Sequence, residues 1–210
     1  MSRALAWDGC VNVRDLGGLP TEDGGATRFG SVVRGDRPSR LTDDGWRALA
    51  AHGIRRVLDL RAAEELGDEP PPRAAVDVVR VPLMGEEDAA YLRELADRRA
   101  TFAEWYVDTL DRHRELVARA LAAVADAPEG GVLVHCHGGR DRTGIVCALL
   151  LRLAGVADDA IADDYAVGAP RDAMLGVLAE LDRRWGGAEE YLREAGLDER
   201  QLARLRERLR

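Results

Sequence analysis

Residues 132–144 read Val-Leu-Val-His-Cys-His-Gly-Gly-Arg-Asp-Arg-Thr-Gly, and this stretch decides the local fold around which the remaining chain is arranged. Its first three residues form a short apolar run, which is typical of a buried strand. Residues 143–153 form a longer apolar run that predicts a helix, ending before Gly155. We therefore expect a strand, a glycine-containing loop and a helix in direct succession.

A loop between a strand end and a helix start is suited to binding an anion. Several backbone N–H groups can turn toward one point there, and the helix N-terminus adds a favourable field. Glycines allow close approach of the backbone, and an arginine offers two parallel donors to phosphate oxygens. The sequence therefore predicts a phosphate-binding segment consisting of His137, Gly138, Gly139, Arg140, Asp141 and Arg142.

Cys136 is the candidate nucleophile, because five residues separate it from Arg142 and the positive surroundings favour the reactive thiolate near neutral pH. Attack on phosphorus would form a phosphocysteine, which water would then hydrolyse. Thr143 could donate a hydrogen bond to the sulfur as it leaves. This chemistry requires neither a metal nor a cofactor, and we expect none. A lone cysteine after an apolar strand is more often structural, but Arg142 and the glycines favour catalysis.

The leaving group also needs a proton donor, and two carboxyl groups are candidates. Asp141 lies within the loop, where the alternative role is to cap the helix. Asp59 ends a short apolar strand at residues 56–60, where the alternative is an ion pair with Arg61. The sequence does not choose between them. His135 is expected to orient the loop through a hydrogen bond rather than to transfer a proton.

The remaining elements follow from hydrophobic periodicity and from turn residues. Arg14 and Asp15, in the first strand, could support the loop or pair on the surface. No repeat or convincing linker divides the chain, so a single domain is expected over residues 1–210. Residues 12–18 are expected to form a short strand and a turn, and residues 31–34, 56–60, 76–83 and 132–134 are the other expected strands. The expected helices are residues 41–53, with Thr42 as N-cap and Gly53 beyond the end, 87–127 as two helices, 143–153, 158–167, 171–184 and 189–210.

Composition excludes several classes of protein. A formal net charge of −8 argues against a nucleic-acid binder, and the apolar runs are too short for stable insertion into a membrane. Three cysteines are too few for a disulfide framework, with Cys147 expected in the core and Cys10 without a role. With no signal-peptide pattern at the start, we expect a cytoplasmic protein. The oligomeric state stays open.

The residues His135, Cys136, Arg142 and Thr143 match the signature His-Cys-(five residues)-Arg-(Ser/Thr), so the chain resembles the cysteine-dependent protein tyrosine phosphatases. It is most similar to the bacterial atypical tyrosine and phosphoinositide phosphatases, whose loop typically reads His-Cys-x-x-Gly-Lys-Asp-Arg-Thr-Gly. Residues 12–18 and 53–61 also resemble that subgroup. The sequence departs from the pattern at Arg140, where the subgroup has lysine, and this chain contains no lysine.

The resemblance implies an α/β fold, with a central, mainly parallel sheet flanked by helices and the loop at the carboxyl end of the sheet. It implies a phosphatase acting on phosphotyrosine in proteins, with phosphoinositide or dual-specificity activity as the alternative. Two further alternatives are a non-catalytic module that binds phosphorylated partners, and sulfur transfer or arsenate reduction. The last would need a cysteine relay, which Cys10 and Cys147 support only weakly.

Overall fold

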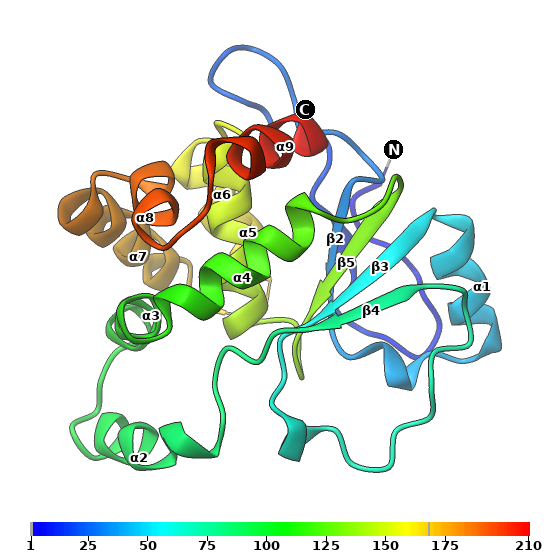
Figure 1. Ribbon diagram of the computed structural model, residues 1–210, viewed down its shortest axis with the longest axis horizontal. Helices are drawn as coiled ribbons and strands as arrows, with labels where there is room; N and C mark the ends of the chain where they lie inside the picture. Colours follow the sequence, from blue (N-terminus) through cyan, green and yellow to red (C-terminus); the bar gives the residue numbers. More distant parts are fainter. Residues whose placement is uncertain (1, 168) are drawn as a thin grey trace.

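Strand β5 (Gly131–His135) lies at the centre of a five-stranded sheet in the computed structural model, which describes residues 2–167 and 169–210. The strand order is β1-β2-β5-β3-β4. The parallel strands are β2 (Val32–Gly35), β3 (Ile54–Asp59), β4 (Asp77–Arg80) and β5, and the short β1 (Arg14–Asp15) pairs antiparallel with β2 at one edge. Helices flank both faces of the sheet (Figure 1), so the expected mainly parallel α/β fold is confirmed.

The alternation of side chains along β5 divides the strand between two hydrophobic cores. Val132 and Val134 face the larger core, while Leu133 between them faces the smaller one. Successive side chains of a strand point to opposite faces, so an uninterrupted apolar run is buried on both sides. Helix α1 (Asp43–Ala51) covers the smaller core with Trp46 and Leu49.

The larger core is organised around helix α5 (Asp141–Leu153), which is buried along nearly all of its length. The helices that contribute buried side chains to the same core include α3 (Phe102–Arg112), α4 (Arg114–Ala125), α6 (Asp158–Tyr165), α7 (Arg171–Trp185), α8 (Ala188–Glu194) and α9 (Glu199–Leu209). A helix that is apolar on all sides is stable in water only when other elements surround it. The position of α5 in turn fixes the position of the loop that precedes it.

The structure confirms the boundary signals of α1. The side chain of Thr42 accepts a hydrogen bond from the N–H of Gly45, as an N-cap does, and the helix stops just before Gly53, whose φ is +87°. Leu41, Leu49 and Ile54 are buried in the smaller core, as their spacing predicts.

Two of the sequence-based helix predictions were too coarse. Residues 87–127 form three helices instead of two: α2 (Ala89–Asp97), α3 (Phe102–Arg112) and α4, preceded by the 3-10 turn η3 (Glu86–Asp88). The chain turns at Arg99, whose φ is +54°, and Thr101 begins α3 with a capping box that includes Glu104. Residues 189–210 form α8 and α9 rather than one helix, because the chain turns at Gly196, whose φ is +108°.

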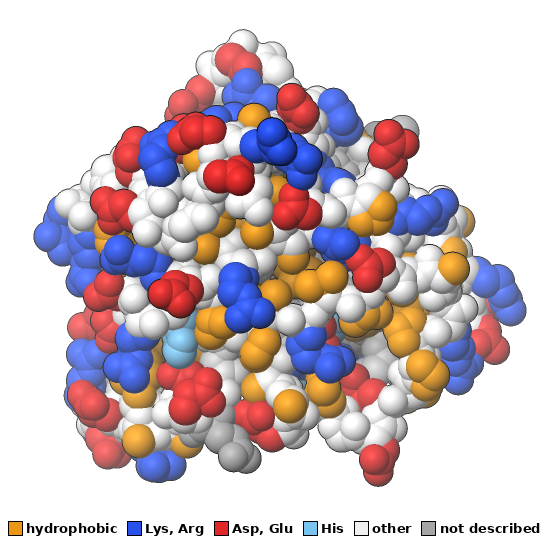
Figure 2. All heavy atoms as spheres, viewed as in Figure 1, with side chains coloured by type: hydrophobic (Ala, Val, Ile, Leu, Met, Phe, Trp, Pro, Cys, Tyr) orange, Lys and Arg blue, Asp and Glu red, His pale blue; other side chains and the backbone are white. Residues whose placement is uncertain are grey.

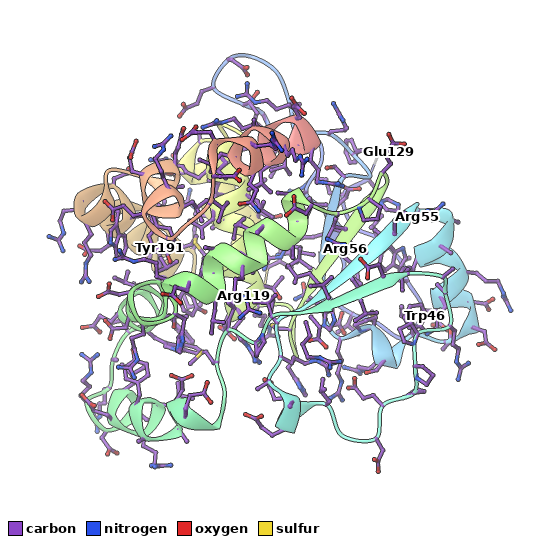
Figure 3. All side chains as sticks on the ribbon, viewed as in Figure 1. Trp46, Arg55, Arg56, Arg119, Glu129 and Tyr191 are labelled. Carbon is purple, nitrogen blue, oxygen red and sulfur yellow. The ribbon has the colours of Figure 1, made fainter. Side chains whose placement is uncertain are left out.

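Arginine side chains connect the elements at the surface. Arg56 of β3 donates to the carbonyl oxygen of Ala123 on α4 at 2.7 Å and to the carboxylate of Asp77 on β4 at 2.8 Å (Figure 3). Basic and acidic side chains alternate over the visible face (Figure 2). Within residues 2–167 and 169–210, no helix has the length and apolar character needed to cross a membrane.

Candidate active site

The carboxyl ends of three parallel strands meet at one edge of the sheet. His135, the last residue of β5, is in register with Gly35 of β2 on one side and with Asp59 of β3 on the other. The residues that follow these strands are therefore brought together, which is the usual location of ligand sites in open α/β sheets. The phosphate loop, which we define as residues 136–142, leaves β5 at this edge and enters α5.

Cys136 lies at the base of the phosphate loop and is 3% exposed. The thiol is free and lies near the guanidinium of Arg142. Thr143 is fully buried, and its hydroxyl has no hydrogen-bond partner among the described residues. A buried hydroxyl without a partner carries a free-energy cost, which an acceptor coming within hydrogen-bond distance would relieve.

Arg142, the second residue of α5, is held by the carboxylate of Glu65. Its Nη2 donates to Oε1 of Glu65 at 2.7 Å, and its Nη1 pairs with Oε2. Glu65 is itself fixed, because its Oε2 accepts the N–H of Ala62 at 3.0 Å within the 3-10 turn η2 (Ala63–Glu65). Burial opposes the charge of Arg142, but Glu65 and the nearby Cys136 raise its pKa overall. The guanidinium is thus oriented before any ligand is bound.

The underside of the phosphate loop is bound by two polar side chains. Nδ2 of Asn12 donates to the carbonyl oxygens of Gly138 and Gly139, at 2.8 and 3.3 Å, and Nη2 of Arg34 donates to that of Gly139 at 3.0 Å. These three hydrogen bonds hold the backbone of the loop in place, in a segment of the kind that binds anions through its N–H groups.

A buried ion-pair network supports these side chains in turn. Asp164 of α6 pairs with Arg34 at 2.7 Å and with Arg14 at 3.3 Å, and Arg14 also donates to Oδ1 of Asn12 at 2.6 Å. Burial would raise the pKa of Asp164, but the charges of Arg34, Arg14 and Arg3 lower it overall. Of the two roles open for Arg14, the structure shows support of the loop. Asp15 accepts from the N–H groups of Gly17 and Gly30, and therefore fixes the neighbouring turn.

The two loop glycines differ in what they contribute. Gly139 has a φ of +68°, and a Cβ placed on it would lie 2.3 Å from the carbonyl oxygen of Gly35 at the end of β2. Only glycine fits that contact and that backbone angle together. A Cβ on Gly138 would meet no atom within 4 Å. Close approach of the backbone is therefore a requirement at Gly139 alone.

The two candidate acids have different surroundings. Asp141 begins α5 and is partly exposed, and its Oδ1 accepts a hydrogen bond from the hydroxyl of Tyr106. Asp59 is 2% exposed, and its two oxygens accept from Nε and Nη2 of Arg61, both at 2.9 Å. Burial would raise the pKa of Asp59, but hydrogen bonds from Arg61 lower it overall.

The remaining loop residues differ in burial. His135 is buried, and its Nδ1 donates to the carbonyl oxygen of Cys136 at 3.0 Å, which is the orienting contact expected for it. Burial lowers the pKa of His135, so the neutral ring is favoured. His137 and Arg140 are exposed. Cys147 of α5 is buried in the larger hydrophobic core, and Cys10 is partly buried beside Arg37.

Several residues of this site were not predicted from the sequence. Glu65, Arg34 and Asp164 support the loop, yet each belongs to a different helix or strand that is distant from the loop along the chain. Their partners are fixed by the tertiary fold, and no local pattern marks them. Tyr106 and Tyr165 were not singled out either, because both lie inside predicted helices and no motif marks them. Within the described residues there is no group of three or more potential ligands that could hold a metal ion.

Comparison with known proteins gives consistent matches. A model described as the tyrosine phosphatase family matches residues 5–170 and 166–210. A tyrosine-protein phosphatase of Nostoc commune is 32% identical, over 85% of this chain and 74% of that protein. The triple specificity protein phosphatase PtpB of Mycobacterium tuberculosis is 28% identical, over 94% of this chain and 96% of that protein.

Among solved structures, the core catalytic domain of the PP-IP phosphatase SIW14 from S. cerevisiae gives a TM-score of 0.45 at 16% identity. The match covers 76% of this chain and 85% of that chain. At that TM-score, no conclusion about this chain depends on the likeness.

Proposed function

The chain belongs to the tyrosine phosphatase family and is a phosphatase of that type, and we propose that its catalytic site is the phosphate loop with Cys136 as nucleophile. The observation that carries this proposal is the arrangement around Cys136. The loop carbonyl groups are bound from behind by Asn12 and Arg34, and the guanidinium of Arg142 is pre-oriented by Glu65. Such an arrangement leaves N–H groups and a forked donor to bind a phosphoryl group.

In the first step, the thiolate of Cys136 attacks phosphorus and the bond from phosphorus to the leaving oxygen breaks. Asp141 donates its proton to that oxygen, which leaves as the free alcohol or phenol. In the second step, a water attacks the phosphocysteine while Asp141 accepts a proton from it, and the sulfur leaves as a thiolate. The unpartnered hydroxyl of Thr143 supports its role as the donor to that sulfur.

We assign the acid to Asp141 rather than to Asp59 because their partners differ. The carboxylate of Asp59 is paired with Arg61 and kept ionised, so it would have to lose a buried ion pair in order to carry a proton. Asp141 accepts from a neutral tyrosine and is partly exposed beside the loop. A group that alternates between protonated and ionised forms requires surroundings of the second kind.

Phosphotyrosine in proteins is the proposed substrate class, supported by the family match and by the names of the curated relatives. Phosphoinositide is the second candidate. It is favoured by the exposed Arg140, which could bind an additional phosphate at the rim of the loop, and by a relative named a triple specificity phosphatase.

We further propose that residues 1–210 act as one unit. Because the nucleophile is a free thiol, we place the enzyme in a reducing, cytoplasmic compartment.

The test is turnover of 4-nitrophenyl phosphate and of a phosphotyrosine peptide by Cys136→Ser, in buffer containing a chelator. Loss of turnover to background with retained folding and phosphopeptide binding is expected, since serine is a far weaker nucleophile in this setting. Cys147→Ser, which removes the thiol buried in the core of α5, is the matched control and should retain turnover per folded molecule. Full activity of Cys136→Ser would refute the proposal, and absence of activity in the unmodified enzyme would favour a module that only binds phosphate.

A further inference from the structure

Two buried tyrosines connect the start of α5 with two other helices. Tyr106 comes from α3 and Tyr165 from α6, and their rings meet edge to face, with centroids 6.0 Å apart and planes at 85°. Their hydroxyl oxygens are 2.6 Å apart. The hydroxyl of Tyr106 also contacts Oδ1 of Asp141. Neither ring is exposed to a meaningful extent, at 0% and 2%.

The direction of these hydrogen bonds follows from what each group can donate. An ionised carboxylate only accepts, so Tyr106 donates to Asp141. The single proton of the Tyr106 hydroxyl is then in use, and its oxygen must accept from Tyr165. Burial and the hydrogen bond donated to Asp141 raise the pKa of Tyr106 above its ordinary range, and burial also raises the pKa of Tyr165. Both hydroxyls therefore stay protonated at any pH at which the enzyme would act.

We propose that Tyr165 and Tyr106 are positioning residues that fix Oδ1 of Asp141, and thereby leave Oδ2 to carry the proton to the leaving group. The inference rests on the proposed role of Asp141 as the acid. A carboxyl group that rotates freely presents its proton to the leaving oxygen only part of the time, so a fixed orientation contributes directly to proton transfer. A hydrogen bond to one oxygen selects the other for that proton.

The surroundings hold the tyrosine pair in place. A Cβ on Gly144, one turn into α5, would lie 2.9 Å from the ring of Tyr165, so the absence of a side chain there admits the ring. Tyr165 directly follows Asp164, which is anchored by Arg34 and Arg14. The chain of hydroxyl groups is thus attached to the same helix, α6, that supports the underside of the phosphate loop.

Charged groups near this chain come from every element that packs on it. Arg140 and Arg34 lie on the side of Tyr165, where they oppose the rise in its pKa caused by burial and by Asp141. Arg142 and Cys136 lie on the side of Asp141. Because these charges stay in place when a tyrosine hydroxyl is removed, a change from tyrosine to phenylalanine tests the hydrogen bond and leaves the electrostatic surroundings intact.

The test compares kcat/KM for two substrates, phenyl phosphate and 4-nitrophenyl phosphate. The first has a poor leaving group and depends on the acid, while the second leaves without much help. Tyr106→Phe is expected to lower kcat/KM for phenyl phosphate about 10-fold and to change that for 4-nitrophenyl phosphate by about 2-fold or less. Tyr165→Phe should act in the same direction with a loss of about 3-fold, because it weakens the bond only indirectly.

The double variant gives the sharpest result. Phenylalanine at position 106 cannot accept from Tyr165, so Tyr106→Phe combined with Tyr165→Phe should match Tyr106→Phe alone. Tyr191→Phe is the matched control: this buried tyrosine of α8 (Figure 3) donates to the carbonyl oxygen of Leu110 on α3 at 2.7 Å and does not contact Asp141. It should leave the ratio of the two kcat/KM values unchanged.

Asp141→Asn separates this inference from the proposal on which it rests. If Asp141→Asn leaves the ratio of the two kcat/KM values unchanged, the assignment of the acid is wrong. If Asp141→Asn changes the ratio while Tyr106→Phe does not, the acid stands and the positioning chain is overturned. Losses from Tyr106→Phe and Tyr165→Phe that simply multiply in the double variant would likewise overturn the chain.

Discussion

On the β3 side of the phosphate loop the carboxylates of Asp59 and Glu65 are paired with guanidinium groups, whereas on the α5 side the carboxylate of Asp141 accepts from a neutral tyrosine. The two sides differ in what a proton would do. A proton on Asp59 would break a buried ion pair, while a proton on Asp141 would leave the hydrogen bond from Tyr106 available. The ion pairs on the β3 side therefore stabilise the structure of the site, whereas Asp141 on the α5 side can change its protonation state.

The largest expected effect tests this division directly. Asp141→Asn should lower kcat/KM for phenyl phosphate by about 10²–10⁴-fold, the usual range for loss of a general acid. Asp59→Asn should lower it by about 10-fold or less per folded molecule, because the residue only supports neighbouring side chains. Steady-state kinetics with both variants decides the matter. A larger loss from Asp59→Asn would reverse the assignment of the two sides.

The second prediction concerns the free energy of unfolding, which Asp59→Asn should lower more than Asp141→Asn does. Asp59→Asn replaces an ionised partner of the buried Arg61, which then keeps Glu69 as a charged partner. We expect a loss of about 2–3 kcal/mol in the free energy of unfolding. For Asp141→Asn, on a partly exposed residue, a change of about 1 kcal/mol or less is expected. Urea unfolding at pH 7 measures both, and equal losses would contradict the comparison.

The smallest effect is the pH dependence of that stability difference. The pKa of Asp59 is lowered in the folded protein, so its stabilising contribution is present above the unfolded-state pKa of about 3.9 and is lost as the pH falls through the folded value. The gap between the unmodified protein and Asp59→Asn should therefore narrow as the pH drops from 5 toward 2. Unfolding midpoints across this range provide the measurement. A gap that widens in acid would contradict the sign.

The chemistry of the loop could be predicted from sequence because it is local. Cys136, Arg142 and Thr143 lie within one strand-loop-helix segment, and the strand, the loop and the helix form where their patterns indicate. Arg14 was a candidate for support of the loop because it lies in the first predicted strand, and Asn12 lies in the same stretch. The partners of these residues could not be predicted, since the pairing of Glu65 with Arg142 and of Asp164 with Arg34 depends on how distant elements pack.

The helix errors have a different cause. The capping boxes Thr101-x-x-Glu104 and Asp198-x-x-Gln201 begin α3 and α9, and both are visible in the sequence. Hydrophobic periodicity does not mark these starts, and α8 and α9 pack their apolar faces on the same core. Caps are thus a better guide than periodicity to the boundary between consecutive helices.

The contact between Gly139 and the end of β2 has a consequence for how this protein can vary over evolution. Any side chain at position 139 must overcome both a left-handed backbone angle and the carbonyl oxygen of Gly35. Position 138, immediately before it, carries no such steric barrier. Descendants of this sequence can therefore acquire new substrate preferences by enlarging residue 138 and its exposed neighbours at the rim, while residue 139 remains glycine in every lineage that keeps the loop seated on the sheet.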